Sequence, residues 1–285
     1  MENNFEEPNF DMEQDLFVMV KDEKRFNDDE VNPSLLKANI LILSYNRPRM
    51  LQEAIESILG QEYYNFELMV IDDGSDFDVW GTIDSFRDKR LTLVQAPQIT
   101  IEERLQKSRI AENMNQVISN IPDEQMIFYL CDDDIFAPRW LIRAMLGATS
   151  YPDMHIVQGE AWYFNDGEDW RTEAIYGMPD GYQQQAGIPT MYWSTGSFAH
   201  RALCWKQEGL RWKDNSFGHS QDTNFILNMW NTHKNYLVVN KPAIYRREHE
   251  NALSSKLGRK DKNGRYKPGF LPPKVNEKMI TGMME

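Results

Sequence analysis

Short apolar runs alternate with amphipathic stretches through the first half of the chain. Continuous apolar segments predict four buried strands, over Ala38–Ser44, Phe66–Ile71, Leu91–Gln95 and Met126–Leu130. After Pro48, apolar residues recur at the i, i+3, i+4, i+7 and i+8 spacing of an amphipathic helix, at Leu51, Ala54, Ile55, Ile58 and Leu59. Further helices are predicted over Val79–Phe86, over Ile101–Ile121 and after Pro138.

This order of elements predicts an α/β protein with a mostly parallel central sheet and helices on both faces. From His155 onward the pattern changes to aromatic-rich strands and glycine turns, including Gly159–Tyr163 and Trp170–Tyr176, followed by a helix over Thr223–Trp230. We therefore expect one domain over residues 37–254, with a first half (37–150) and a mixed second half (151–254). An acidic extension over 1–36 and a basic tail over 255–285 would flank it.

Composition narrows the class of partner and the compartment. The formal net charge of −13 argues against sequence-independent binding of duplex DNA by the whole domain. The basic stretch Lys256–Lys274 is either a solvated chain end or a surface for phosphates or a membrane. Two cysteines are too few for a disulfide framework. No apolar run reaches the length of a membrane span, and the N-terminus does not resemble a signal peptide. A cytoplasmic protein without an integral membrane segment is predicted.

An acidic triplet, Asp132-Asp133-Asp134, directly follows Cys131 at the end of the fourth predicted strand. Ligands of parallel sheets bind outside the carboxyl ends of the strands, so Tyr45, Asp72-Asp73 and the triplet are expected on one rim. Three carboxylates at the end of a buried strand are costly unless a cation lies among them. A hard divalent ion takes such oxygen ligands, whereas a solvated loop turn is the alternative interpretation.

Several ordered segments resemble glycosyltransferases of the family 2 type, which have the Rossmann-like GT-A fold. They are I-L-S-Y-N-R-P, F-E-L-M-V-I-D-D-G-S, D-D-D-I-F-A-P and F-G-H-S-Q-D-T-N-F, and together they cover roughly Ala38–Ser254. The segment E-E-R-L-Q-K-S-R-I-A is further similar to spore-coat polysaccharide biosynthesis transferases of this family. The resemblance implies a metal-dependent, inverting transfer of a hexose or pentose from a UDP-sugar to a hydroxyl acceptor.

The resemblance also implies a Mn²⁺ or Mg²⁺ ion that bridges the donor diphosphate and the acidic rim. Asp133 matches the metal ligand, and Asp134 supports the metal directly or through water. The late segment Tyr245–His249 resembles the family's Y-R-x-H motif, whose histidine completes the metal shell. Cys131 stands where the family's first aspartate is customary. A thiol suits a hard ion poorly, so we interpret Cys131 as a packing residue.

For the nucleotide, Asp73 matches the residue that accepts a hydrogen bond from uracil N3–H, and Tyr45 matches the residue that stacks on the ring. Asp132 is expected near the ribose, and Arg104 and Arg109 near the nucleotide. Each residue also has a structural interpretation. Aspartate favours the D-D-G-S turn in any case, an aromatic at a strand end is commonly core, and an arginine on a helix is commonly solvated.

For catalysis, the resemblance assigns the general base to Asp222, which takes the proton of the acceptor hydroxyl. Gln221 replaces the glutamate that usually precedes it, which removes a like charge beside Asp222. The alternative role of Asp222 is the N-cap of the following helix. Trp193, Thr195 and Gly196 match the segment that shapes the acceptor pocket, although Trp193 also suits a buried core position.

The acceptor stays open at this stage. A saccharide is the ordinary acceptor of such enzymes, and hydroxymethylated bases of phage-type DNA would suit the basic tail. A nucleotidyltransferase should carry a phosphate-binding loop rich in glycine and basic residues near the first strand. The segment S-Y-N-R-P at this place has little of that composition. A sugar-nucleotide-binding protein without activity would not need Asp222.

Overall fold

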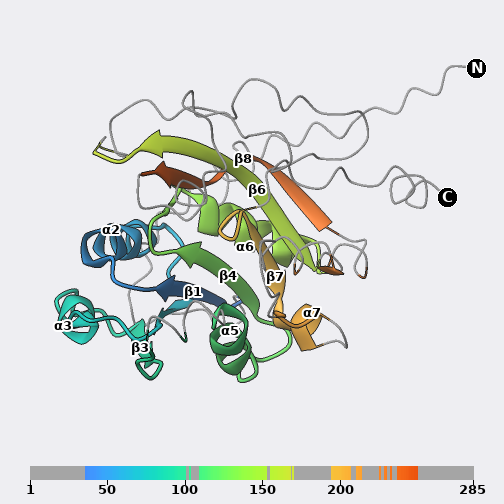
Figure 1. Cartoon of the computed structure of the whole chain (residues 1–285). Coiled ribbons are helices and arrows are strands. Elements are labelled where there is room, and N and C mark those ends of the chain that lie inside the picture. The colour runs from blue at the N-terminus through green and yellow to red at the C-terminus, as the bar shows by residue number, and fades with distance from the viewer. Residues whose placement is uncertain are drawn as a thin grey trace, which may run out of the picture.

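A computed structural model describes residues 36–100, 103, 109–152, 155–167, 169, 194–206, 210–213, 225, 228–229, 232 and 236–249. Within this part of the chain, eight strands form one sheet in the order β3-β2-β1-β4-β7-β6-β8-β5 (Figure 1). Four of them pair in parallel, namely β3 (Leu91–Gln95), β2 (Phe66–Asp72), β1 (Ala38–Ser44) and β4 (Met126–Cys131). The parallel half predicted from the apolar runs is confirmed.

The second half of the sheet is mixed, as expected. Strand β7 (Phe198–Arg201) is antiparallel to β4, and β6 (Ile156–Asn165) is antiparallel to β7. The long strand β8 (Tyr236–Glu248) then runs parallel to β6, and the short β5 (Ile135–Phe136) pairs with it antiparallel. Strand β8 was not predicted. It places the end of the Y-R-x-H segment beside the residues that follow β4.

Helices cover both faces of the sheet. The buried residues of α2 (Pro48–Leu59), α3 (Val79–Asp84) and α6 (Trp140–Ser150) join one apolar cluster, together with Ile40 and Ile42 of β1. Those of α5 (Ile110–Ile118) and α7 (Ala202–Lys206) join the other, together with Leu41. Neighbouring residues of a strand point to opposite faces. Coverage of both faces therefore explains why the β1 segment is apolar without alternation. Figure 1 shows α2 and α6 on one side of β1 and β4, and α5 on the other.

One predicted helix has the wrong extent. The pattern predicted a single helix over Ile101–Ile121, but Arg109 is not helical, α5 begins at Ile110, and it ends at Ile118. The Arg109 backbone has φ −96° and ψ 1°, and its Nη1 donates to the Pro97 carbonyl oxygen at 2.6 Å. A contact with the loop after β3 thus holds the residue that precedes α5. The spacing of apolar residues along the chain cannot reveal such a contact.

Several expectations fall outside the described residues. They are the N-terminal extension up to residue 35, the strand over Trp170–Tyr176 and the C-terminal tail. Of the helix expected over Thr223–Trp230, Phe225, Asn228 and Met229 are described, and they are helical. Among the described residues, none of the helices is long and apolar enough to cross a membrane.

Candidate active site

The carboxyl ends of β1, β2 and β4 meet at one rim of the sheet. Ser44 is in register with Asp72, and Leu43 with Cys131. The Asp73 amide donates to the Ser44 carbonyl oxygen at 2.9 Å. The Tyr45 amide donates to Asp132 Oδ2 at 3.0 Å. The structure therefore brings together the three strand ends that the topology rule placed on one rim.

Asp132 is buried and surrounded by donors from the first strand end. Its Oδ2 accepts from Ser44 Oγ at 3.1 Å and from the Tyr45 amide, and its Oδ1 accepts from Arg47 Nη1 at 2.7 Å. Burial raises the pKa of Asp132 to about 6. Arg47 works against this rise, and Asp133 adds to it. The loop after β1 is thereby fixed to the loop after β4.

Asp133 lies between the side chains of Arg47 and His249. Its Oδ2 is 3.1 Å from Arg47 Nη1 and 3.1 Å from His249 Nε2. Burial works to raise the pKa of Asp133. The hydrogen bond from His249 and the charge of Arg47 outweigh burial and hold this pKa below its usual range. A carboxylate that stays ionised beside an imidazole is a suitable ligand pair for a divalent ion. Asp133 and His249 are 116 residues apart in the chain.

Asp134 and Cys131 complete the acidic loop. The Asp134 amide closes a turn onto the Cys131 carbonyl oxygen at 3.1 Å, and Asp134 Oδ1 accepts from the Arg247 amide at 3.1 Å. Burial and the neighbouring Asp133 raise the pKa of Asp134 to about 7. The Cys131 thiol is half-buried, and its Sγ lies within 4.8 Å of carboxylate oxygens of Asp133 and Asp134. The Cys131 sulfur is therefore close enough to these carboxylates to be a candidate ligand, and its interpretation as a packing residue stays a prediction.

Arg247 anchors the acidic loop and was missed in the sequence. Its side chain is buried, with Nε donating to the Asp133 carbonyl oxygen at 3.0 Å and Nη1 to Asp166 Oδ1 at 3.0 Å. Its Nη2 donates to Glu53 on α2, and its guanidinium lies 4.6 Å from the Phe164 ring centroid. A buried guanidinium is stable only when its donors are paired in this way. Arg247 thus ties the triplet to α2 and to the turn after β6.

On the other side of the rim, two side chains hold Asp73. Asp73 Oδ1 accepts from Asn113 Nδ2 at 3.0 Å and faces Arg109 Nε at 3.2 Å. Arg109 was expected near a nucleotide, and the structure places it against this carboxylate. Asn113 was not singled out in the sequence. Its position one helical turn after Arg109 was the available signal, because residues three or four apart share a helix face.

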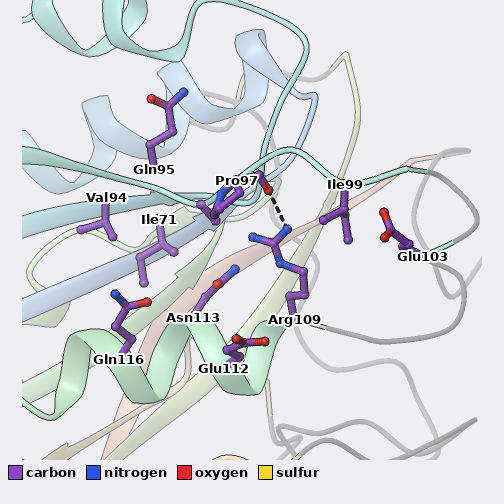
Figure 2. Close-up of a pocket in the computed structure, with 11 residues that line it drawn as sticks. Ile71, Val94, Gln95, Pro97, Ile99, Glu103, Arg109, Glu112, Asn113 and Gln116 are labelled. Carbon is purple, nitrogen blue, oxygen red and sulfur yellow. Dashed lines mark hydrogen bonds between the residues drawn. The ribbon is translucent and has the colours of Figure 1, made fainter.

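A cavity of about 480 Å³ lies beside Asn113 and Arg109, between α5 and the end of β3. Figure 2 shows Arg109 reaching toward Pro97, with Asn113 and Gln116 further along the helix. The lining combines apolar with polar and charged residues, namely Ile71, Val94, Gln95, Ala96, Pro97, Ile99, Glu103, Arg109, Glu112, Asn113 and Gln116. This combination is typical of small-molecule sites.

The D-D-G-S turn requires its glycine. Gly74 has φ 79°, and a Cβ there would lie 2.9 Å from the Gln98 Cα. The loop after β3 therefore packs directly on this turn. Asp72 Oδ1 accepts from the Ser75 amide at 3.0 Å, which closes the turn and presents Asp73 at the rim.

The candidate acceptor residues are only partly described. Thr195 is half-buried and lies in the turn before β7. Gly196 is buried, and a Cβ there would lie 2.7 Å from Ile244 Cγ2, so its size is needed for packing against β8. Arg104, Trp193 and Asp222 lie outside the described residues.

Comparisons with known proteins identify the family and the fold. Residues 39–250 match the family model described as glycosyl transferase family 2. Protein CgeD of Bacillus subtilis is 30% identical over 121 residues, which are 42% of this chain and 28% of CgeD. The Escherichia coli enzyme WfaP, a UDP-Glc:alpha-D-GlcNAc-diphosphoundecaprenol beta-1,3-glucosyltransferase, is 33% identical over 57 residues, which are 20% of this chain and 23% of WfaP. The matched segments thus span less than a third of each of these two relatives.

Solved structures show the same fold. Residues 1–349 of S. aureus TarS in complex with UDP-GlcNAc superpose with a TM-score of 0.59 at 14% identity, covering 76% of this chain and 60% of that one. The complex of the same TarS fragment with UDP gives a TM-score of 0.59 at 14% identity, covering 75% and 61%. At this identity the likeness concerns the fold.

Proposed function

Since the chain belongs to glycosyl transferase family 2, we propose that it transfers a sugar from a UDP-sugar to a hydroxyl acceptor with inversion at the anomeric carbon. One observation carries this proposal. The same rim holds Asp73, with the cavity beside it, and the Asp133–His249 pair. One end of this rim suits a base, and the other suits a diphosphate with its counterion.

We assign Asp73 to the uracil ring, with Tyr45 at the neighbouring strand end as its stacking partner. Asn113 and Arg109 both bind Asp73 Oδ1, so they fix the direction in which the carboxylate points. Asp132, held by the Tyr45 amide, lies between this end and the metal ligands, which suits a residue near the ribose. The TarS complexes with UDP and UDP-GlcNAc, on the same fold, support a UDP-sugar as the donor.

The residues at the other end of the rim fit a divalent ion. Asp133 Oδ2 and His249 Nε2 lie 3.1 Å apart, as two ligands directed at one ion do. Asp134 and Cys131 lie close enough to contribute, although a thiolate favours softer metals than Mg²⁺. When bound, Mn²⁺ or Mg²⁺ would stabilise the diphosphate leaving group as a Lewis acid. Asp133 and His249 would hold the ion, and Arg247 would keep the Asp133 backbone in place.

We assign Asp222 as the base of the transfer step, on the F-G-H-S-Q-D-T-N-F segment. Its carboxylate takes the proton of the acceptor hydroxyl as that oxygen bonds to the anomeric carbon. The bond between the anomeric carbon and the diphosphate oxygen breaks at the same time, and the transition state has oxocarbenium character. Gln221 stands where the family has a glutamate, which removes a like charge that would favour the protonated form of Asp222.

A saccharide is the acceptor that we propose. WfaP, which matches over 57 residues, carries in its name a sugar-diphosphoundecaprenol acceptor. The test is incubation with a panel of UDP-sugars and Mn²⁺, offered saccharide acceptors and hydroxymethylated DNA in separate reactions and read by mass spectrometry. The expected product is a saccharide that has gained the mass of one sugar. Exclusive labelling of the DNA would replace the acceptor assignment, and labelling of neither with any UDP-sugar would overturn the proposal.

Asn113→Leu is expected to weaken UDP binding about tenfold. The change leaves Asp73 Oδ1 without one of its donors, and a lost hydrogen bond to a charged partner costs about 1.5 kcal/mol or more. Calorimetric titration with UDP measures the effect, and titration with ADP should show that discrimination between the bases falls.

Asn120→Leu is the matched control, since Asn120 is exposed just beyond the end of the same helix. Equal UDP affinity of Asn113→Leu and the wild type would remove Asn113 from base recognition.

A further inference from the structure

A side-chain cation lies among the candidate metal ligands. Arg47 Nη1 is 2.7 Å from Asp132 Oδ1 and 3.1 Å from Asp133 Oδ2. The same Asp133 oxygen is 3.1 Å from His249 Nε2. One arginine nitrogen therefore contacts the oxygen that the proposed ion needs. The sequence argument for the metal held that the acidic triplet requires a cation, and Arg47 already supplies one.

The backbone of Arg47 is fixed, whereas its guanidinium lies at the rim. Asn46, with φ 55°, donates its amide to Ser75 Oγ at 2.9 Å, and its side chain exchanges hydrogen bonds with Asp76. Pro48 then begins α2 immediately after Arg47. The Arg47 side chain is 30% exposed, compared with 2% for Asp132. The backbone that carries Arg47 is therefore fixed, and the Arg47 guanidinium is accessible to a ligand.

We infer that Arg47 is a tethered competitor of the metal ion. In the protein without donor, Arg47 holds Asp133 and repels a second cation, so the divalent ion binds weakly. A diphosphate offers the guanidinium a stronger, bidentate partner. When Arg47 turns to the phosphates, Asp133 and His249 become available to the ion. Donor and metal binding are then coupled through Arg47, and the coupling is reciprocal.

Both halves of this inference rest on the metal site of the proposed function, and only the donor half rests on the UDP-sugar. The first test measures Mn²⁺ binding without nucleotide, by the electron paramagnetic resonance signal of free Mn²⁺. Arg47→Gln is expected to bind Mn²⁺ about tenfold more tightly than the wild type, because a positive charge a few ångströms from the site is removed. Arg49→Gln is the matched control. It makes the same charge change two residues away, but Arg49 pairs with Glu53 and Asp166 instead of the triplet. Its Mn²⁺ affinity should stay within about twofold of the wild type.

The second test adds ligand to the same titrations. UDP is expected to raise the Mn²⁺ affinity of the wild type by a larger factor than that of Arg47→Gln. Uridine, which has the base and ribose but no phosphate, should leave the Mn²⁺ affinity of both proteins unchanged. Because UDP itself binds Mn²⁺, the decisive quantity is the difference between the two proteins.

Equal or weaker Mn²⁺ binding by Arg47→Gln overturns the inference, and so does the absence of Mn²⁺ binding by both proteins. Thermal unfolding verifies that the variant is folded. If it is not, Arg47→Met takes its place. It removes the same charge and keeps an unbranched side chain, so Mn²⁺ affinity is again expected to rise above that of the wild type, and an unchanged value is contrary to the inference. Failure of UDP to bind any of these proteins would count against the proposed function, while the nucleotide-free comparison still decides the role of Arg47.

Discussion

Asp133→Asn is expected to reduce sugar transfer about a thousandfold and to abolish the Mn²⁺-dependent part of UDP binding. The substitution keeps the size of the side chain and removes its charge, so His249 loses the anionic partner with which it would share the ion. Loss of metal stabilisation of a leaving group amounts to several kcal/mol, and about 4 kcal/mol corresponds to a thousandfold in rate. Calorimetry with UDP, with and without Mn²⁺, and initial rates measure the two effects.

Asp84→Asn is the control for this experiment, because it makes the same charge change at an exposed position on α3. The fold should tolerate Asp133→Asn, since Arg247 binds the Asp133 main-chain carbonyl and not its carboxylate. If Mn²⁺ stimulates UDP binding equally in Asp133→Asn and the wild type, Asp133 is not a metal ligand.

Asp222→Asn is the second large effect that we expect. Turnover should fall by about two to four orders of magnitude, which is the usual contribution of a positioned general base. UDP affinity should change by less than about twofold, because none of the groups assigned to the nucleotide is altered. The measurements are initial rates at saturating donor and acceptor, and calorimetric titration with UDP.

The pH profile distinguishes a base from a structural residue. In the wild type, kcat/KM should fall toward acid pH as Asp222 becomes protonated, and this acid limb should be absent from the residual activity of Asp222→Asn. If Asp222 serves as a helix N-cap, Asp222→Ser should retain near-normal turnover, because serine caps helices as well as aspartate does. Near-normal turnover in either variant would remove Asp222 as the base.

The local hydrophobic patterns of the sequence predicted the bounds of two strands and the extent of one helix with different success. Strand β1 has the predicted bounds Ala38–Ser44, and β3 the predicted bounds Leu91–Gln95. The long helix expected from Ile101 is the instructive error. Its apolar periodicity continues across Arg109, but Arg109, whose side chain contacts Pro97, is not helical, and α5 begins at Ile110. Periodicity reports which face of a segment is buried, and it contains no information about a single side chain that reaches another loop.

For the candidate site, the strand-end rule was sufficient to place Tyr45, Asp73 and the acidic triplet at one rim. The strands β1, β2 and β4 pair in parallel, as the sequence predicted. Their continuous apolar runs indicate burial on both faces, and the predicted helices between them indicate crossover connections. Gly74 likewise follows from local chemistry, because the turn after β2 requires a positive φ.

Only the tertiary structure decided how the charges of the rim are paired. Arg47 and Asp132 are 85 residues apart, and Arg247 and Glu53 are 194 apart. These pairs exist because β8 pairs with β5, which directly follows the acidic loop, and because the loop after β1 binds Asp132 at the end of β4. The sequence by itself determined the family, the parallel sheet and the acidic rim. The fold decided which arginines pair with the carboxylates of that rim, because electrostatic pairing depends on distances in space that residue order does not encode.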